Sequence, residues 1–510
     1  MEESVMRKLF SALLTFALII GTIGLVSFFD VQAVNIKLSV NGIYYPSFEE
    51  GWNAAVAAET AEVVLFDDWK ANGGSMGSGS GFNGGRIYAK NRANIILDLN
   101  GHIIDREMTS NSSKGQIFYI EDHAKITICD SSEGHTGQIR GANADDGGAF
   151  YMFDSAELML IDVTVCNNRA EDYGGAICFE ESSKVYLKGA TVIRNNGTDY
   201  CGGAIYAGDD AVLEIGDNVV VEKNKAQYGG GLYIEDDAKV YMRGNSVVTE
   251  NVSMKEGGGI YLYWYAKGYL YDNSKVSANY ALKNCEGAEL VINNATVEAP
   301  GGIKNENATL TVDGGSFKGS VNSGVALKGT ITGGNFSPEM IDFLRNYAAS
   351  GYVTAKSSDG TEYTVVENVY YTYLGAGLKY SGATADSAKI RFGYDFADDF
   401  DLEASDWRWN YGILNKDNLN QSISGENYDS KNVTNLVVAG IVPRRYNDPI
   451  YAQLSFNINI DDKTYTIEDS IRGTYINYLA AAIKNNESEP ETVKEYAKQL
   501  IEEYIYNTQK

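Results

Sequence analysis

A row of tyrosines recurs through the middle of the chain at one position of a repeated motif. The motif is Gly-Gly followed by three residues, and its last position is a tyrosine in most copies. The residues at this position are Tyr151, Cys178, Tyr206, Tyr233 and Tyr261. A tyrosine can stack on a sugar ring and hydrogen-bond through its hydroxyl group. Tyr151, Tyr206, Tyr233 and Tyr261 are therefore candidate ligand-binding residues for a carbohydrate.

The third position of the same motif is always small. It holds Ala149, Ala176, Ala204, Gly231 and Gly259. We expect these residues to face outward and form a flat floor beside the tyrosines, on which a sugar chain could lie. The alternative is that stacked tyrosines only stabilise neighbouring repeats, and this alternative is favoured because such ladders arise in any β-solenoid.

Two glutamates stand two residues after the tyrosine position in alternate repeats. The column they belong to reads Phe153, Glu180, Gly208, Glu235 and Tyr263. If the repeats stack like strands, Glu180 and Glu235 lie about 9 to 10 Å apart along the stack. Inverting glycosidases separate their two carboxylates by about 6.5–9.5 Å. Glu180 and Glu235 are thus the catalytic candidates of an alternative hypothesis, although glutamate is common on solvated faces.

Metal and cofactor sites have little support in the sequence. Acidic residues recur at the turn after each motif, and a Ca²⁺ ion could bridge them. These residues are Asp122, Asp154, Glu181, Asp209 and Asp236. The usual preference of aspartate for turns explains most of this pattern. No Cys-x-x-Cys motif occurs and the three histidines are scattered, so we predict no metal site and no cofactor, with Ca²⁺ left open.

The spacing of the Gly-Gly motif predicts the architecture that positions the tyrosines and glutamates. Its copies begin at Gly147, Gly174, Gly202, Gly229 and Gly257, in steps of 27, 28, 27 and 28 residues. A second marker keeps the same period and reads Asn168, Asn196, Asn224, Asn251 and Asn279. Two markers with one period indicate a solenoid of stacked repeats.

Alternation within each repeat predicts three strands. The inward columns of the first strand are apolar: Phe150, Ile177, Ile205, Leu232 and Ile260, with Met152, Phe179, Ala207, Ile234 and Leu262 two residues later. Two further alternating stretches follow in each repeat and end at the asparagine. The predicted fold class is therefore all-β, a right-handed parallel β-helix, with the asparagines forming a structural ladder at one turn.

The ends of the solenoid and the rest of the chain differ from the repeats. A helix over Phe48–Ala58 and a short helix from Ser337 to about Ala349 are expected to cap residues 34–355, with Ser337 as N-cap. Residues 366–510 lose the repeat, and their alternating stretches predict a β-sandwich-like domain. Its end, Pro490–Tyr506, has helical spacing.

The N-terminal segment indicates where the protein is located, and its net charge limits the partners that it can bind. Arg7 and Lys8 precede an uncharged run over Leu9–Phe29, and Val31-Gln32-Ala33 fits a cleavage site. We predict a signal peptide over residues 1–33, a secreted or cell-surface location, and no membrane span after its removal. The alternative is an uncleaved anchor, since the apolar run is long enough to just span a bilayer. The net charge of −26 argues against nucleic acid as a partner.

Two resemblances can be drawn from these motifs. Gly202-Gly203-Ala204-Ile205, followed by Val221 three residues before Asn224, resembles the repeats of chlamydial polymorphic outer membrane proteins over about residues 140–285. This resemblance implies a passenger-type β-helix used in adhesion. The whole chain is also similar to adhesin-like surface proteins of the pectin-lyase fold, because Gly333-Gly334-Asn335-Phe336-Ser337 ends the solenoid before a short helix.

The leading functional hypothesis is a non-catalytic adhesion module that binds an extracellular glycan or another ligand on a host or cell surface. A polysaccharide lyase or glycoside hydrolase is the first alternative, and a structural spacer is the second. Lyases of this fold resemble one another in placing Arg or Lys on the groove, and the outward columns above contain neither. The Asn-Thr-Asp and Gly-His-Gly motifs of polygalacturonases are also missing.

Overall fold

The structure is a computed structural model. It describes residues 36–278, 281–322, 330–379, 389–401, 405–413, 421–424, 433–439, 449–474, 477, 479–480, 484 and 491–508. The expected signal peptide over residues 1–33 lies outside the described residues, and so does Asn279. No helix of the described residues is both long and apolar enough to cross a bilayer.

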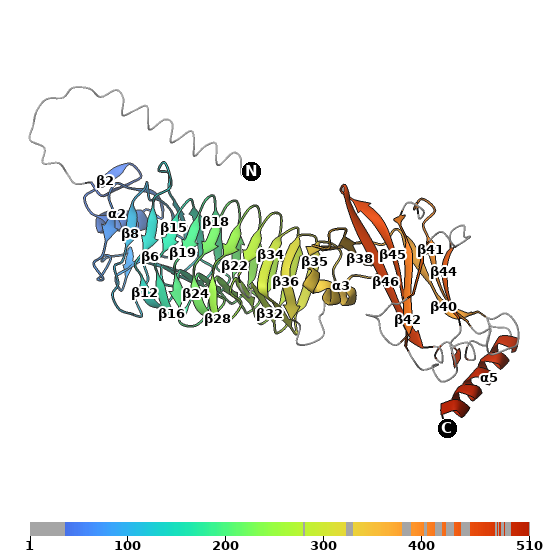
Figure 1. Ribbon diagram of the computed structural model, residues 1–510. Coiled ribbons are helices and arrows are strands. Elements are labelled where there is room, and N and C mark those ends of the chain that lie inside the picture. Colours follow the sequence, from blue (N-terminus) through green and yellow to red (C-terminus); the bar gives the residue numbers. More distant parts are fainter. Residues whose placement is uncertain are drawn as a thin grey trace, which may run out of the picture.

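The described chain forms a right-handed parallel β-helix followed by an antiparallel β-domain (Figure 1). The first stack of the solenoid contains β6 (Arg86–Ala89), β9 (Phe118–Ile120), β13 (Phe150–Met152), β17 (Ile177–Phe179), β21 (Ile205–Ala207), β25 (Leu232–Ile234), β29 (Ile260–Leu262) and β32 (Leu282–Cys285). The second stack contains β3 (Thr60–Leu65), β7 (Asn94–Asp98), β10 (Lys125–Cys129), β14 (Glu157–Ile161), β18 (Lys184–Lys188), β22 (Val212–Ile215), β26 (Lys239–Met242), β30 (Lys267–Leu270), β33 (Glu289–Asn293) and β35 (Thr309–Asp313). The third stack contains β4 (Trp69–Lys70), β8 (Ile103–Asp105), β11 (Gln138–Arg140), β15 (Thr164–Cys166), β19 (Val192–Arg194), β23 (Val220–Glu222), β27 (Val247–Thr249) and β31 (Lys275–Ser277).

The central coils contain a fourth short strand that the sequence analysis did not predict. Its stack consists of β12 (Asn143–Asp146), β16 (Arg169–Tyr173), β20 (Gly197–Thr198), β24 (Lys225–Tyr228) and β28 (Val252–Glu256). These strands lie between the asparagine of one coil and the Gly-Gly pair that begins the next motif. They pair in parallel and form a narrow fourth wall beside the first stack.

The predicted inward columns form the solenoid core. Phe150, Ile177, Ile205 and Leu232 are completely buried, and the ring of Phe150 stacks on Phe118 at 4.9 Å. Ile205 pairs with Ile177 and Leu232 on the adjacent coils, which keeps each apolar column in register. The inward assignment of the apolar columns is therefore confirmed.

The asparagine ladder is also present, and it is buried. Asn224 is 0% exposed, and its Oδ1 accepts hydrogen bonds from the backbone N of Asn196 at 2.9 Å and from Asn196 Nδ2 at 3.1 Å. Its own Nδ2 donates to Asn251 Oδ1 at 2.9 Å and to the carbonyl of Ile193 at 3.0 Å. One coil earlier, Asn196 Oδ1 accepts the corresponding hydrogen bonds from the backbone N and Nδ2 of Asn168. One amide per coil thus satisfies backbone groups at a turn and fixes the alignment of the next coil.

Both ends of the solenoid are covered. At the N-terminal end, β1 (Leu38–Val40) and β2 (Ile43–Tyr45) extend the second stack, and α2 (Phe48–Ala57) lies over the open core with Trp52 completely buried. At the other end, η2 (Pro338–Met340) and α3 (Ile341–Tyr347) follow β37 (Asn335–Phe336). Ser337 occupies the expected N-cap position, but its hydroxyl forms no capping bond and donates to the carbonyl of Gly319 at 2.9 Å.

The coils shorten after β31, and the part of the chain that the structure describes contains no further strand of the fourth stack. The third and first strands then merge into the single long strands β34 (Thr296–Glu306) and β36 (Ser316–Asn322), which pair with each other in parallel. β34 pairs with both β31 and β32, so it continues two stacks at once. Among the described residues, the fourth wall therefore covers only the central coils.

The C-terminal domain is antiparallel and continues from the solenoid by hydrogen bonding. β37 pairs with β39 (Tyr363–Glu367), β39 pairs with β38 (Tyr352–Ser357), and β38 pairs with β46 (Lys463–Thr474). Its other elements are β40 (Tyr371–Lys379), β41 (Lys389–Phe396), β42 (Arg408–Ile413), β43 (Gln421–Ser424), β44 (Val433–Ala439), β45 (Pro449–Ile460) and α5 (Glu491–Thr508). The ring of Phe456 on β45 lies 5.2 Å from Phe396 on β41, so the two sheets pack face to face as expected for a sandwich.

The ladder can be tested with one buried and one exposed asparagine. Asn224→Ala should lower the free energy of unfolding by about 3 kcal/mol, because it leaves buried backbone and amide groups without partners. Asn245→Ala is the matched control, since Asn245 bonds to Asn218 at 3.2 Å in an exposed amide ladder. It should cost less than about 0.5 kcal/mol in the same urea denaturation. Equal costs for the two variants would show that burial of the ladder contributes nothing.

Candidate functional site

The tyrosines of the first stack point away from the solenoid core, but they are not open to solvent. Tyr206, Tyr233 and Tyr261 are 5%, 7% and 8% exposed, and Tyr151 is partly buried. The rings of Tyr206 and Tyr233 stack at 5.9 Å, and those of Tyr233 and Tyr261 at 4.9 Å. The expectation of an exposed row is therefore wrong for three of the four residues. Their role in binding stays a prediction.

The fourth wall covers these rings. Tyr173 at the end of β16 lies 4.6 Å from the ring of Tyr206, and Tyr228 at the end of β24 lies 5.9 Å from Tyr261. Tyr200, between these two, is 5.9 Å from both Tyr173 and Tyr228. The contacts close a circuit of rings, here called the tyrosine cluster. Its members are Tyr173, Tyr200, Tyr206, Tyr228, Tyr233 and Tyr261.

The small residues of the motif do not form an outward floor. Ala149, Ala176 and Ala204 are completely buried and belong to the solenoid core. The reason is the Gly-Gly pair before them, which makes the corner between the fourth and first strands. Gly174 has φ +60°, in the left-handed region that glycine adopts without strain, and a Cβ on Gly175 would overlap the backbone of Gly203. This corner turns the next residue inward.

The accessible aromatic surface lies at the edge of the cluster. Tyr200 is 44% exposed and Trp264 is 52% exposed. Trp264 stacks at 5.5 Å on Tyr263, which lies 6.2 Å from Tyr261, so the aromatic surface continues from the buried rings to solvent. We call Tyr200, Tyr228, Tyr263 and Trp264 the aromatic rim. The sequence analysis missed Tyr200, Tyr228 and Trp264. The repeated Tyr-Gly-Gly at residues 173–175 and 228–230 was a usable signal for Tyr228, and no repeated motif marks Tyr200 or Trp264.

Glu180 and Glu235 follow β17 and β25 on the turn side of the cluster. Both are partly buried. Glu235 accepts a hydrogen bond from the Tyr206 hydroxyl, and a Cβ on Gly208 would lie 3.0 Å from that hydroxyl. Tyr206 therefore occupies the space beside Gly208 that the sequence analysis expected to be a gap between the two acids.

The electrostatics of the two glutamates differ because only one has hydroxyl partners. Burial, followed by the charges of Asp209 and Asp146, raises the pKa of Glu180 to about 7. Burial also raises the pKa of Glu235, while hydrogen bonds from Tyr206 and Tyr233 act in the opposite direction. Burial and the charge of Asp172 raise the pKa of Asp146 to about 6. Near neutral pH the carboxyls of Glu180 and Asp146 can therefore serve as hydrogen-bond donors or acceptors for a hydroxylated ligand.

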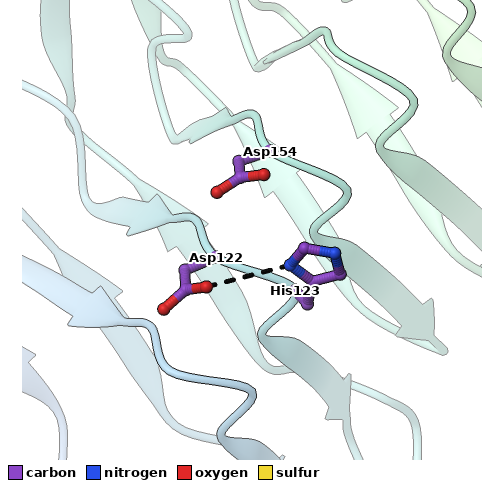
Figure 2. Close-up of side chains that lie close together, drawn as sticks. All are labelled: Asp122, His123 and Asp154. Carbon is purple, nitrogen blue, oxygen red and sulfur yellow. Dashed lines mark ion pairs between the residues drawn. The ribbon is translucent and has the colours of Figure 1, made fainter.

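The acidic turns contain one group with the spacing of metal ligands. Figure 2 shows Asp122, His123 and Asp154, each of which offers one ligand atom within 4.8 Å of the others. His123 Nδ1 lies 3.8 Å from Asp122 Oδ1. Asp122 Oδ2 also accepts the backbone N–H of Asn91 at 3.0 Å, so this carboxylate already stabilises a turn. These three residues could hold a cation, and a role for Ca²⁺ here stays a prediction.

In the coils that follow Tyr261, basic residues occupy the position that tyrosine holds in the earlier repeats. Lys283 pairs with Tyr261 in the strand register, and its side chain is 4% exposed. Its Nζ lies 3.0 Å from Glu256 and 2.5 Å from Glu306, while Lys304 lies 2.6 Å from Glu256. The tyrosine row thus ends in a network of paired charges.

Comparison with known proteins identifies one repeat. Residues 162–180 match the Chlamydia polymorphic membrane protein repeat. This segment contains Asn168 and the Gly174-Gly175 corner, so the match falls within the range of the resemblance drawn from the motifs. No curated protein and no solved structure matches the chain.

The buried acid predicts a pH-dependent stability. Because the pKa of Glu180 in the fold, about 7, lies above its ordinary value of 4.5, the fold favours the neutral acid. The associated stability is fully present below pH 4.5 and is lost as the pH rises through 7. Glu180→Gln should therefore raise the free energy of unfolding at pH 8 by about 1–3 kcal/mol relative to the unmodified chain.

The same variant should have little effect at pH 4. Urea denaturation at the two pH values measures both quantities. Glu181→Gln is the matched control, because this neighbouring glutamate is exposed and its substitution removes the same charge. A loss of stability at pH 8 in the Glu180 variant would show that its carboxylate is stabilised, not penalised, by the fold.

Proposed function

We propose that the chain is an exported, surface-associated adhesion protein that binds carbohydrate without cleaving it. The observation that carries this proposal is the aromatic rim, which continues from the tyrosine cluster and lies along one side of an elongated solenoid. Exposed Tyr200 and Trp264 offer rings for stacking, and the partly buried Glu180 and Glu235 offer hydrogen-bonding groups on the same central coils. The repeat shared with chlamydial polymorphic membrane proteins supports a surface location.

In this proposal, most of the tyrosines predicted to bind the ligand support the binding surface instead of contacting the ligand. Tyr206, Tyr233 and Tyr261 support the rim from below, since they are buried beneath the fourth wall. Tyr151 is partly buried and lies 5.8 Å from Phe153, so it can contribute directly at the far end. Replacing the buried rings would cost stability, which makes the exposed rim the better place to test binding.

Glycan cleavage is a second candidate because Glu180 has the raised pKa of a general acid. In an inverting hydrolysis it would protonate the leaving glycosidic oxygen, and Glu235 would take a proton from the attacking water. The carboxylate of Glu235 is instead engaged by the hydroxyl of Tyr206. The geometry therefore favours binding over hydrolysis. A reducing-sugar assay on every glycan that binds separates the two, and turnover abolished in Glu180→Gln would establish the enzyme.

The binding proposal predicts the effect of removing the rim. On a glycan array and then in calorimetry, Tyr200→Ala and Trp264→Ala should each weaken binding of the selected glycan about fivefold. Tyr271→Ala is the control, because this partly buried tyrosine follows β30 in the second stack, and its ring packs at 5.1 Å against Arg243. Undiminished affinity in both rim variants would place the binding site elsewhere. A loss in the Tyr271 variant alone would place it on the second stack.

A further inference from the structure

Lysine, arginine and tyrosine gather on the outward face of the second stack, from β18 to β30. The first outward position of these strands holds Lys184, Val212, Lys239 and Lys267, which follow one another in register. The next outward position holds Tyr186, Glu214, Tyr241 and Tyr269. Two residues further along the chain stand Lys188, Arg243 and Tyr271. We call this surface the basic face.

The charge of the basic face is positive. Within the part of the chain that the structure describes, no ion pair is formed by any of its five cations, Lys184, Lys188, Lys239, Arg243 and Lys267. By contrast, Lys125 on β10 pairs with Glu157 at 2.9 Å. The single acid of the basic face is the exposed Glu214, so five positive charges oppose one negative charge.

The tyrosines of the basic face offer groups that favour anions. The rings of Tyr241 and Tyr269 lie nearly parallel at 4.8 Å, and the Arg243 guanidinium lies 5.1 Å from the ring centroid of Tyr271. Because the faces of stacked rings cover each other, these partly buried rings offer their edges and hydroxyl groups to a ligand. A ring edge carries partial positive charge, and a phenol hydroxyl donates a hydrogen bond. Lysines line one side of this tyrosine row, and Lys188 and Arg243 line the other.

The basic face continues at its N-terminal end into a hollow. The hollow has a volume of about 640 Å³, and Lys184 belongs to its lining. Other lining residues are Arg92, Lys125, Ser155, Glu157 and Ser182. Lys125 neutralises Glu157, while Arg92 and Lys184 have no acidic partner among the described residues. The hollow therefore suits an anionic group better than a cation.

The net charge of −26 does not prevent an anion from binding here. At physiological ionic strength, exposed charges are largely screened beyond about 8 Å. Acids also lie in the turns on both sides of the basic face, such as Asp237 before β26 and Asp272 after β30. Asp272 Oδ2 accepts the backbone N–H of Gly244 at 3.0 Å, so this carboxylate is held at its turn. A polyanion avoids both lines of turns only if it runs lengthwise along the solenoid.

We infer that the basic face binds a linear glycan that carries sulfate esters and lies lengthwise along the solenoid. Cations on both sides of the tyrosine row match anionic groups on both sides of one sugar, which sulfate esters at two positions supply. A polyuronate carries one carboxylate per sugar and matches less well. The inference goes beyond the proposed function, which concerns the aromatic rim, where the carboxyls of Glu180 and Glu235 disfavour a sulfated chain.

Calorimetry with a sulfated glucose oligomer and its unsulfated counterpart tests the inference. Changing Lys239→Gln and Lys267→Gln together should weaken binding of the sulfated oligomer about tenfold, because two charge-assisted contacts are lost. The same double variant should leave any binding of the unsulfated oligomer unchanged. Glu214→Gln should strengthen binding of the sulfated oligomer about threefold, because it removes the one repelling charge. Misfolding cannot produce such a gain.

Lys225→Gln is the matched control, because it removes an exposed lysine on β24 of the fourth stack and should leave the affinity unchanged. Undiminished affinity in the lysine double variant, or an equal loss in the Lys225 variant, would overturn the inference and leave the proposed function standing. So would a sulfated oligomer that does not bind, or tighter binding of an oligogalacturonate or a single-stranded oligonucleotide of equal length. An equal loss in Tyr200→Ala would place the sulfated chain on the rim and contradict a separate site.

Discussion

The in-register stacking of coils is the constraint on which the rest of this structure depends. Equivalent turns of adjacent coils must lie directly against each other, because the buried side-chain amides of Asn168, Asn196 and Asn224 each bond to the asparagine of the following coil. Residues at the same position of successive repeats therefore lie next to one another and form a column along the solenoid. Columns of identical chemistry, including the tyrosine row, follow from this alignment.

The Gly-Gly corner brings the aromatic residues of two neighbouring stacks together. Because the corner turns the chain sharply, the fourth strand lies beside the first, and Tyr173 and Tyr228 face Tyr206 and Tyr261. Beyond the last strand of the fourth stack the coils shorten. Lys283, which is paired with Glu256, then stands at the position that tyrosine holds in the earlier coils. The extent of the fourth wall thus sets the extent of the aromatic surface and its acidic neighbours.

The sequence predicted the fold well because the fold depends on periodic features. The 27- or 28-residue period, the apolar columns and the asparagine ladder are all visible as repetition, and the structure contains each of them. The fourth strand was missed because β16 reads Arg-Ala-Glu-Asp-Tyr, which lacks an alternating apolar pattern. Because that strand was missed, the repeated Tyr-Gly-Gly was not recognised as marking the residues that cover the tyrosines.

The site could be predicted only in part for a related reason. Alternation shows the side of a strand from which a side chain projects, but burial also depends on what packs against that side. Tyr206 projects outward as predicted and is nevertheless 5% exposed. Likewise, the acids Glu180 and Glu235 lie two coils apart as predicted, yet the Tyr206 hydroxyl beside Gly208 could not be foreseen from spacing.

Hydrogen–deuterium exchange on the protein, with and without a bound glycan oligomer, tests the central claim most directly. The claim is that a ligand lies on the rim formed by the first and fourth stacks of the central coils. Binding should slow exchange in peptides covering residues 173–208 and 225–265 and leave the peptides of β40, β41 and β44 in the C-terminal domain unchanged. Protection confined to the C-terminal domain, or to the second stack, would contradict the account.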